Sequence, residues 1–393
     1  MQKSIFAVAL LAASAAAWAW QMASVKLPAP YATPSSTNRA QVIDRPNGAK
    51  LNLPAGFTIA EYASDFNRPR YMLQGPSGEI LLTDSTENGK VYLLFDKNKD
   101  QVADGRKELL TGLDRPYGLA FHEDYLYVAE TTSLKRYKYD AKALTVGAGQ
   151  ELVKLNDFGK GHWTRTIAFD SKGKLYLGVG SQSNVDHGEP VMRAAISKMN
   201  ADGTGQEIFA TGTRNPTSIR FYPGTDTLWS AVQERDGLGD DLVPDYLTSI
   251  KQGGFYGWPY SYIGPNADPR RDEKPELVAK TIVPDIVLGA HVAVLDFLPY
   301  TGKQFPAEYR NGVFIAQHGS WNRSQRIGYN VMFVPFKDGK PSGPPKEFLT
   351  GWMLSPRQRE VWGRPVGFLQ LLDGSLLVTD DGANKVWRIS YKN

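Results

Sequence analysis

The sequence predicts an all-β protein, a six-bladed β-propeller, and three observations carry this prediction. The 393 residues include 38 Gly and 25 Pro, with 11% aromatic residues, and few stretches show a long helical pattern. A unit of polar entry, apolar strand, Gly/Asp turn and second apolar strand recurs along the chain. Its early copies lie roughly 50 residues apart, which is the period of a four-stranded propeller blade.

The clearest copy of the unit runs from Gly161 to Gly180. His162 and Arg165 precede an apolar strand at 166–169, a turn follows at 170–173, and a second apolar strand begins at Lys174. Five further copies have their entries at Arg68, Arg115, Arg214, His291 (degenerate) and Arg364. Six copies fill residues 51–393 as one domain, with longer loops such as 265–284 inserted between later strands. A β-sandwich offers no reason for so regular a spacing.

The N-terminus reads as an export signal over residues 1–19. Lys3 precedes an apolar run that ends in Ala17-Trp18-Ala19, a small-residue cleavage pattern. The run is too short for a confident membrane span, so we expect a periplasmic protein without a stable span after signal removal. An uncleaved signal would instead anchor the protein to the membrane. Residues 20–50 are rich in Pro, Ala, Ser and Thr and predict a flexible arm.

Cysteine content and charge exclude several classes of function. The chain has no cysteine, which rules out disulfides, thiolate metal sites and covalently attached c-type haem. The net charge of +4 is dispersed, and no Lys/Arg-rich run indicates nucleic-acid binding. No Gly-rich phosphate loop follows a strand and no Gly-x-Ser-x-Gly elbow is present, so nucleotide and serine-hydrolase sites have no support.

The blade entries predict a ring of positive charge. In a propeller the first strand of each blade lines the central channel, so equivalent entry residues converge at one end. Guanidinium groups repel one another and cannot shed their charge. Two interpretations stay open: each arginine pairs with an acid of its own blade (Asp84, Glu130 or Asp380), or the cavity holds a polyanion. The converging residues are Arg68, Arg115, His162 with Arg165, Arg214, His291 and Arg364.

Histidine and oxygen-rich stretches supply further candidates. A neutral imidazole accepts a proton near pH 7, which makes His162 a candidate base; His291 and His318 are candidates for the cavity. The stretch 233–245 is dense in carboxylates and turn residues. It is interpreted either as a calcium site, which needs such oxygen ligands, or as a solvated acidic loop. A second loop matches calcium-loop positions one, three, five, seven and nine, with Gln101 where Gly is usual at position six. Its residues are Asp96, Asn98, Asp100, Val102 and Asp104.

With these residues in view, the chain resembles the soluble PQQ-dependent sugar dehydrogenases, especially the L-sorbosone and aldose dehydrogenase branch. The matching segments are 161–165, 214–216, 233–246, 253–259 and 318–323. The resemblance implies a six-bladed propeller that binds PQQ and Ca²⁺ over the channel. PQQ, a tricarboxylate, would then neutralise the arginine ring.

The resemblance also implies a role for individual residues. His162 looks like the base that removes the anomeric hydroxyl proton while hydride passes to the quinone C5, and Arg214 looks like the arginine that steadies the oxyanion. Backbone carbonyls of Glu234 and Arg235 would hold calcium, which polarises the quinone. The implied cofactor contacts are Arg165, Asn215, His318, Arg323 and Arg364.

One departure concerns the partner of His162. Glucose-oxidising members carry an Asp that orients this histidine, whereas this chain has Ser181 at the matching position. Glucose-type activity is therefore in doubt, and a different substrate or another acid such as Asp186 would have to compensate.

The expected function is oxidation of a sugar or sugar aldehyde, with electrons passed to an external acceptor. Two alternatives remain open at this stage. One is a calcium-dependent lactonase-like hydrolase on the same scaffold. The other is a non-catalytic propeller that binds peptide or glycan at its rim.

Overall fold

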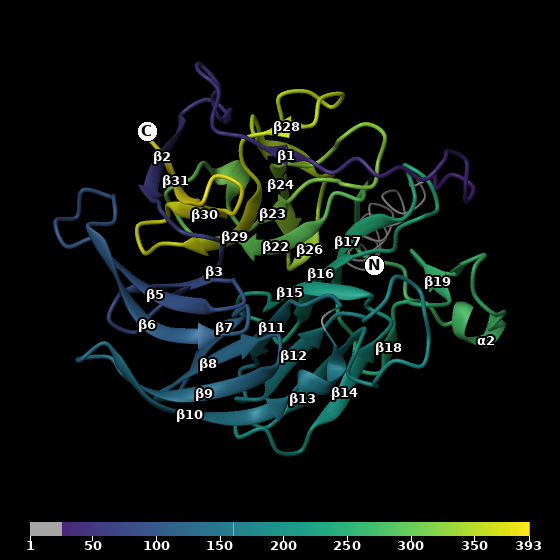
Figure 1. Ribbon diagram of the computed structural model, residues 1–393, viewed down its shortest axis with the longest axis horizontal. Helices are drawn as coiled ribbons and strands as arrows, with labels where there is room; N and C mark the ends of the chain where they lie inside the picture. Colours follow the sequence, from purple (N-terminus) through teal and green to yellow (C-terminus); the bar gives the residue numbers. More distant parts are fainter. Residues whose placement is uncertain (1–25, 160, 393) are drawn as a thin grey trace, which may run out of the picture.

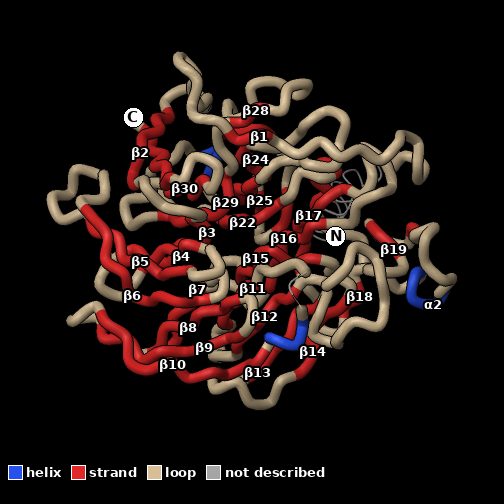
Figure 2. The backbone as a smooth tube through the Cα atoms, viewed as in Figure 1, coloured by secondary structure: helices blue, strands red, loops and turns tan. Residues whose placement is uncertain are grey.

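Six sheets arranged around a central axis confirm the predicted β-propeller (Figure 1). The computed structural model describes residues 26–159 and 161–392. Strands dominate it, and the helical elements in this part of the chain are a short helix α2 (Pro275–Val278) and two 3₁₀ turns at 156–158 and 307–309 (Figure 2). The first strand of each blade contacts the first strand of the next, which closes an inner ring.

The first three blades follow the chain in order. Blade 1 contains β3 (Pro69–Gln74), β4 (Ile80–Asp84), β5 (Gly89–Phe95) and β6 (Gly105–Leu113). Blade 2 contains β7 (Leu119–His122), β8 (Tyr125–Glu130), β9 (Ser133–Asp140) and β10 (Thr145–Lys154). Blade 3 contains β11 (Arg165–Phe169), β12 (Leu175–Val179), β13 (Ala195–Met199), β14 (Glu207–Thr211) and the added β18 (Gly254–Phe255).

The last three blades carry the longer insertions. Blade 4 contains β15 (Asn215–Phe221), β16 (Leu228–Gln233), β17 (Pro244–Ser249) and β21 (Ile286–Ala290). Blade 5 contains β22 (Val294–Pro299), β23 (Val313–Gln317), β24 (Asn330–Val334) and β27 (Lys346–Leu349). Blade 6 contains β29 (Pro365–Gln370), β30 (Leu376–Asp380), β31 (Lys385–Tyr391) and β2 (Phe57–Ala63). Small hairpins join β19 (Ser261–Tyr262) to β20 (Asn266–Ala267) and β25 (Phe336–Lys337) to β26 (Lys340–Pro341).

The two ends of the domain close the ring together. β2, from the start of the domain, pairs antiparallel with β31 and forms the outer strand of blade 6 (Figure 1). The core extends across this seam, because Phe57 packs edge-on against Phe305 and Tyr309 of blade 5 at 4.8 and 5.2 Å between ring centroids. Closure thus leaves no unpaired inner strand in the ring.

The described part of the expected flexible arm, residues 26–50, is packed against the propeller rather than loose. β1 (Gln41–Val42) pairs in parallel with β28 (Glu360–Val361). Backbone N–H groups of Tyr31 and Asn38 donate to the carbonyls of Leu238 (2.8 Å) and Trp321 (2.6 Å). Composition suggested disorder, but these partners come from loops of blades 4 to 6 that are distant in the sequence.

The predicted signal peptide, residues 1–19, lies outside the described residues. Among the residues that are described, no helix is long and apolar enough to cross a membrane.

Four of the six inner strands carry a register irregularity close to their entry. The breaks fall in β3 after Pro69, in β15 after Pro216, in β22 after Val294 and in β29 after Pro365. A β-bulge bends its strand and re-aims the neighbouring side chain. These irregularities therefore separate the entry residues from the regular alternation of the strand and place them at one end of the ring.

Buried side chains fill the axis beneath this end. Asp296 of β22 accepts hydrogen bonds from Ser218 of β15 (2.6 Å) and from the Phe368 N–H of β29 (2.9 Å), and it pairs with Arg220 at 2.7 Å. The Arg220 guanidinium lies over the ring of Tyr71 on the opposite blade, 5.1 Å from its centroid. The entry end is consequently closed from below by a satisfied polar cluster.

Candidate active site

The acids that follow each second strand cap the entry backbone and do not pair with the arginine side chains. Asp84 accepts from the Arg68 N–H at 2.5 Å, and Asp380 accepts from the Arg364 N–H at 2.7 Å. Glu130 accepts from the Asp114 N–H at 2.7 Å in the same way. The interpretation that these acids neutralise the guanidinium groups of their own blades is wrong, because their oxygens accept from the main chain and from other side chains, such as Lys135 for Glu130 and Trp387 for Asp380.

His162 is held as a neutral base. Its Nδ1 lies 2.8 Å from the Ser181 carbonyl oxygen and 3.0 Å from Ser181 Oγ, which in turn donates to the Ser183 carbonyl at 2.6 Å. A carbonyl only accepts, so Nδ1 carries the proton and Nε2 presents its lone pair. Burial and the nearby Arg214 lower the pKa of His162 to about 3. The ring is therefore uncharged near neutral pH.

Arg214 links the entry of blade 4 to two neighbouring loops. Its Nη1 donates to the Glu234 carbonyl at 2.6 Å and its Nε to the Asn184 carbonyl at 3.1 Å. The nearest acid is Asp236, with 3.5 Å between Arg214 Nη2 and Asp236 Oδ2. Arg214 Nη2 also donates to Asn184 Oδ1 at 3.0 Å. Three of the five N–H donors of the guanidinium are therefore used within the protein, which fixes its position and leaves two. The adjacent Asn215 donates to Gln233, while its Oδ1 is buried and finds no hydrogen-bond partner within residues 26–159 and 161–392.

Asp236, which the sequence did not single out, joins blade 4 to blade 5. It accepts a hydrogen bond from Asn322 Nδ2, and its Oδ1 lies 3.5 Å from Nδ1 of His291. The opposite nitrogen, His291 Nε2, donates to the Gly239 carbonyl at 2.9 Å. Burial alone would raise the pKa of Asp236, but His291 and Arg214 lower it. The predicted acidic stretch 233–245 was the available signal, yet it did not distinguish this carboxylate from its neighbours.

A second cluster forms where blades 1, 5 and 6 meet. His318 Nε2 lies 2.7 Å from Asp381 Oδ1, and Arg364 Nη2 lies 2.8 Å from His318 Nδ1. Asp381 also pairs with Arg70 at 2.5 Å. Burial and Arg364 lower the pKa of His318 to about 3, so its Nε2 donates to Asp381 and its Nδ1 accepts from Arg364. Both ring nitrogens of His318 are occupied.

The arginine ring is only partly neutralised by acids. Arg115 pairs with Glu87, and Arg214 lies near Asp236. Within the described residues, Arg68 and Arg364 are in no ion pair, although Asp381 is close to both. Burial and the neighbouring Arg70 lower the pKa of Arg68, as expected for crowded like charges. Positive charge therefore remains at this end of the axis.

Two predicted cofactor contacts, Arg165 and Arg323, bond to the protein through part of their guanidinium groups only. Arg165 Nε and Nη2 and Arg323 Nε are buried without a hydrogen-bond partner among the described residues, so a cofactor contact by either arginine stays a prediction. Arg165 is fully buried, and its Nη1 donates to the carbonyls of His162 (2.7 Å) and Thr164 (3.0 Å). Arg323 pairs with Asp241 at 2.6 Å, and its Nη1 donates to the Asp240 carbonyl. Arg165 thus supports the backbone that presents His162, while Arg323 ties two loops together.

The side chains of the predicted calcium residues in blade 4 are also engaged. Arg235 is fully buried and pairs with Glu234 at 3.0 Å and with Asp268 at 3.1 Å. The Glu234 carbonyl accepts from Arg214, but Glu234 Oε1 is buried and has no hydrogen-bond partner in the described part of the chain. Among the described residues, no three His, Cys, Asp or Glu side chains gather as a metal site. Calcium at Glu234 and Arg235 stays a prediction.

The second predicted calcium loop bonds to its own backbone. Asp104 Oδ2 accepts from the Lys97 N–H at 2.5 Å, and Asp96 Oδ2 accepts from the Gln101 N–H at 3.1 Å. Asp100 Oδ1 accepts from the N–H of Val102 at 2.9 Å. Asn98 Nδ2 donates to Asp100 at 3.0 Å. Calcium binding by this loop also stays a prediction.

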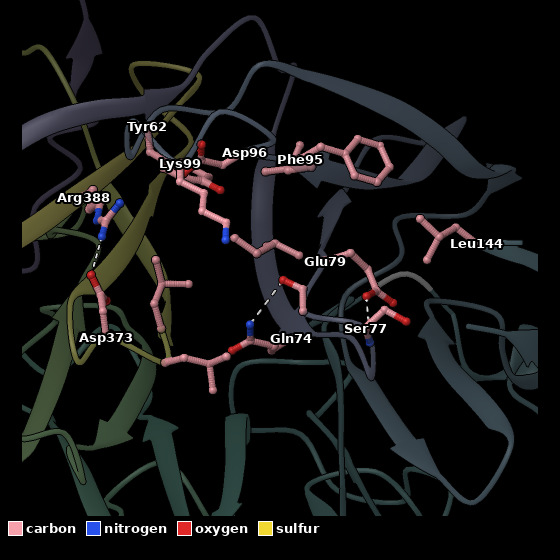
Figure 3. Close-up of a pocket in the computed structure, with 15 residues that line it drawn as sticks. Tyr62, Gln74, Ser77, Glu79, Phe95, Asp96, Lys99, Leu144, Asp373 and Arg388 are labelled. Atoms are coloured by element: carbon pink, nitrogen blue, oxygen red, sulfur yellow. Dashed lines mark hydrogen bonds and ion pairs between the residues drawn. The ribbon is translucent and has the colours of Figure 1, made fainter. Parts of the chain in front are cut away.

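A cleft of about 460 Å³ opens at the other end of blade 1 (Figure 3). It is lined by the turn between β3 and β4, including Gln74 and Glu79, and by Asp96 and Lys99 of the second calcium loop. The entry residues Arg68 and Asp84 occupy the opposite ends of the same strands. The cleft is thus separate from the candidate active site.

A match to a protein-family model over most of the chain shows the family of this protein. The TrAA12-like family model covers residues 51–245 and 248–392. This chain belongs to the TrAA12-like family. The matched residues include both histidine clusters and all six blades.

The individual relatives share less than 30% of their aligned residues with this chain. The chain is 29% identical over 358 residues to an uncharacterised protein of Borreliella burgdorferi, covering 87% of this chain and 91% of that one. It is 28% identical to the pyrroloquinoline quinone-dependent pyranose dehydrogenase of Coprinopsis cinerea over 86% of this chain, and it spans only 54% of that protein. The holo PQQ domain of the Coprinopsis cinerea pyranose dehydrogenase superposes with a TM-score of 0.74 at 19% identity, covering 90% of this chain and 99% of the domain. That likeness confirms the fold.

Proposed function

We propose that this protein is a PQQ-dependent sugar dehydrogenase that oxidises a sugar or sugar aldehyde. The observation that carries the proposal is the neutral His162, whose Nε2 has no hydrogen-bond partner among the described residues and whose ring lies within the electrostatic influence of Arg214. It lies at the end of the propeller where unpaired positive charge remains. Membership of the TrAA12-like family and the similarity to a pyranose dehydrogenase support it.

The residues present fit a polyanionic cofactor. Arg364 has a buried Nε without a hydrogen-bond partner, and Arg68 has no ion pair among the described residues. Asn215 offers a buried, unpartnered Oδ1 close to the entry of blade 4. We infer that Arg68 and Arg364 hold carboxylates of PQQ and that Asn215 contacts its ring. When bound, PQQ supplies an acceptor for a hydride and hence for two electrons.

The chain's own residues would then act on the sugar hydroxyl. His162 Nε2 takes the proton of the hydroxyl on the carbon that is oxidised, because Nδ1 already carries a proton fixed by Ser181. Arg214 directs its remaining N–H groups at the oxygen where negative charge develops. The Ser181 carbonyl thus takes the orienting role that an Asp has in the glucose-oxidising sugar dehydrogenases, but it offers no negative charge to a protonated ring.

Calcium, cellular location and electron acceptor are further parts of the proposal. The unpartnered Glu234 Oε1 supports a cation or an ordered water near the carbonyls of Glu234 and Arg235. The signal-like N-terminus supports export to the periplasm. Because the chain has no cysteine for a covalently attached haem, we propose that a separate acceptor removes the electrons.

The two alternatives account for less of the site. A lactonase-like hydrolase needs acidic side chains free to hold a metal on the axis. Here Asp236 lies against Arg214 and His291, and Asp381 pairs with Arg70 and His318. A binding module gives no role to the His162 base.

The deciding experiment adds PQQ and Ca²⁺, separately and together, to purified apoprotein and follows dye reduction with a panel of aldoses. We expect reduction only with PQQ present. Lactone hydrolysis without PQQ would instead support the hydrolase.

A further inference from the structure

Three segments form one continuous surface beside the candidate active site, which we call the arginine face. They are residues 39–45 of the N-terminal arm, 319–326 after β23, and 353–360 before blade 6. Asn38 N–H donates to the Trp321 carbonyl, Arg359 Nε donates to the Arg39 carbonyl at 3.1 Å, and β1 pairs with β28. Arm and loops are therefore fixed to one another (Figure 1).

The arginine face is strongly basic for a protein whose net charge is only +4. Its three segments contain six arginines, no lysine and two acidic residues. Four of the arginines are exposed: Arg39, Arg45, Arg357 and Arg359. None of these four belongs to an ion pair within residues 26–159 and 161–392. Their charge is available to a partner.

Apolar side chains lie among these charges. Trp321 is 40% exposed and Leu354 and Val42 are each 43% exposed, which is unusual for large apolar residues. The Arg39 guanidinium lies 5.3 Å from the Trp321 ring centroid, so a cation and an aromatic surface are presented together. Exposed aromatic and arginine side chains are the residue types that protein interfaces favour.

The arginine face adjoins both histidine clusters. Trp321 precedes Asn322, which bonds to Asp236, and lies in the loop that begins at His318. On the other side, Arg45 lies 5.2 Å from the ring centroid of Trp362, two residues before Arg364. A molecule docked on this face would lie at the edge of the site that holds the reduced cofactor.

We propose that the arginine face is the docking surface for an acidic, single-haem electron-transfer protein. The inference rests on the proposed function, because a sugar dehydrogenase must pass on two electrons in each turnover. Two haem proteins would each take one electron, and two protons would be released to solvent. Charge complementarity selects an acidic partner, since opposite surface potentials raise the rate of encounter and set orientation.

The test compares two c-type cytochromes of similar reduction potential, one of net negative and one of net positive charge. Each is reduced by the PQQ-loaded enzyme with a saturating aldose, and second-order rate constants are measured at low and high ionic strength. We expect the acidic cytochrome to react at least tenfold faster at low salt and to lose most of that advantage at high salt. The double variant Arg357→Glu/Arg359→Glu should lower its rate by about tenfold.

A matched control carries the same charge change on the opposite end of the propeller. Lys142 and Lys172 are exposed in the β9–β10 and β11–β12 turns, so Lys142→Glu/Lys172→Glu should leave the cytochrome rate nearly unchanged. Both double variants should reduce a small uncharged dye at the wild-type rate, which shows that folding and sugar oxidation are intact. Equal rates for the two cytochromes, or equal effects of the two double variants, would overturn the inference alone. Failure of the PQQ-loaded wild type to reduce even the dye would overturn the proposed function and this inference with it.

Discussion

The clusters around the half-buried His162 and the buried His318 differ in one respect that decides their chemistry. His162 and His318 are both strongly desolvated, and the pKa of each is lowered to about 3. Among the described residues, His162 bonds through Nδ1 alone, whereas His318 uses both nitrogens, one for Asp381 and one for Arg364. The comparison teaches that burial and pKa do not identify a base. A free ring nitrogen does.

Replacing His162 should have the largest effect. In His162→Ala we expect turnover at saturating PQQ and sugar to fall by about 10³-fold, within the range of general-base catalysis, while PQQ affinity changes little. His318→Gln is the matched control and should lose less than about tenfold in turnover but bind PQQ more weakly. The measurements are steady-state dye reduction and tryptophan-fluorescence titration with PQQ. Comparable turnover losses in the two variants would break the distinction between the clusters.

Replacing Arg214 should come next. In Arg214→Lys the positive charge remains, but one ammonium cannot bond to the carbonyls of both Asn184 and Glu234 and also face the substrate oxygen. We expect kcat to fall by about 10²-fold with a smaller change in KM, since the loss is of transition-state stabilisation. A variant that changes KM alone would place Arg214 in substrate binding instead.

Replacing Arg364 should affect the cofactor more than the chemistry. Arg364→Ala removes a guanidinium with an unpartnered Nε from the blade-6 side of the ring. We expect the PQQ dissociation constant to rise by roughly 10- to 100-fold, because a charge-assisted contact contributes about 1.5–3 kcal/mol. Turnover should recover at saturating PQQ. Arg115→Ala, whose arginine is already paired with Glu87, should weaken PQQ binding less.

As the pH falls, the folded protein should lose stability before His162 is protonated and stops acting as a base. Both histidines have a folded pKa near 3 against about 6.5 when unfolded, so between these values the unfolded chain binds more protons. These two histidines together should therefore lower the free energy of unfolding by about 4 kcal/mol on going from pH 7 to pH 5. Urea titrations at the two pH values measure the drop, and His162→Gln/His318→Gln should reduce it. Per folded molecule, turnover should not show an inflection near pH 6.5 from His162.

The smallest expected effect concerns the contacts that hold the N-terminal arm to the propeller. Asn38 Nδ2 donates to the Ser324 carbonyl at 2.8 Å, and Arg326 donates to Asn38 Oδ1 at 2.5 Å. Asn38→Ala should lower stability by about 1–2 kcal/mol, measured by thermal unfolding, because Arg326 is buried and loses a partner. Ser35→Ala, an exposed change in the same arm, should be neutral.

The repeat of entry, strand, turn and strand was sufficient to predict the number of blades and the place of His162 and Arg214. Strand patterns are local, and a propeller brings equivalent positions of each copy to the same end. The same reasoning failed for Asp84, Glu130 and Asp380, because it could not tell an acid that caps the backbone from one that pairs with arginine. It also failed for the arm, whose partners are up to 320 residues away.

By itself, the sequence determined that six similar units would each carry a polar entry and that the chain would lack cysteine and nucleotide motifs. Only the tertiary structure decided which entry nitrogens are free, because hydrogen-bond partners such as Asp381 for His318 and Asn322 for Asp236 come from different blades. A residue's type sets what it can donate or accept. The neighbours that folding brings to it set what remains for a ligand.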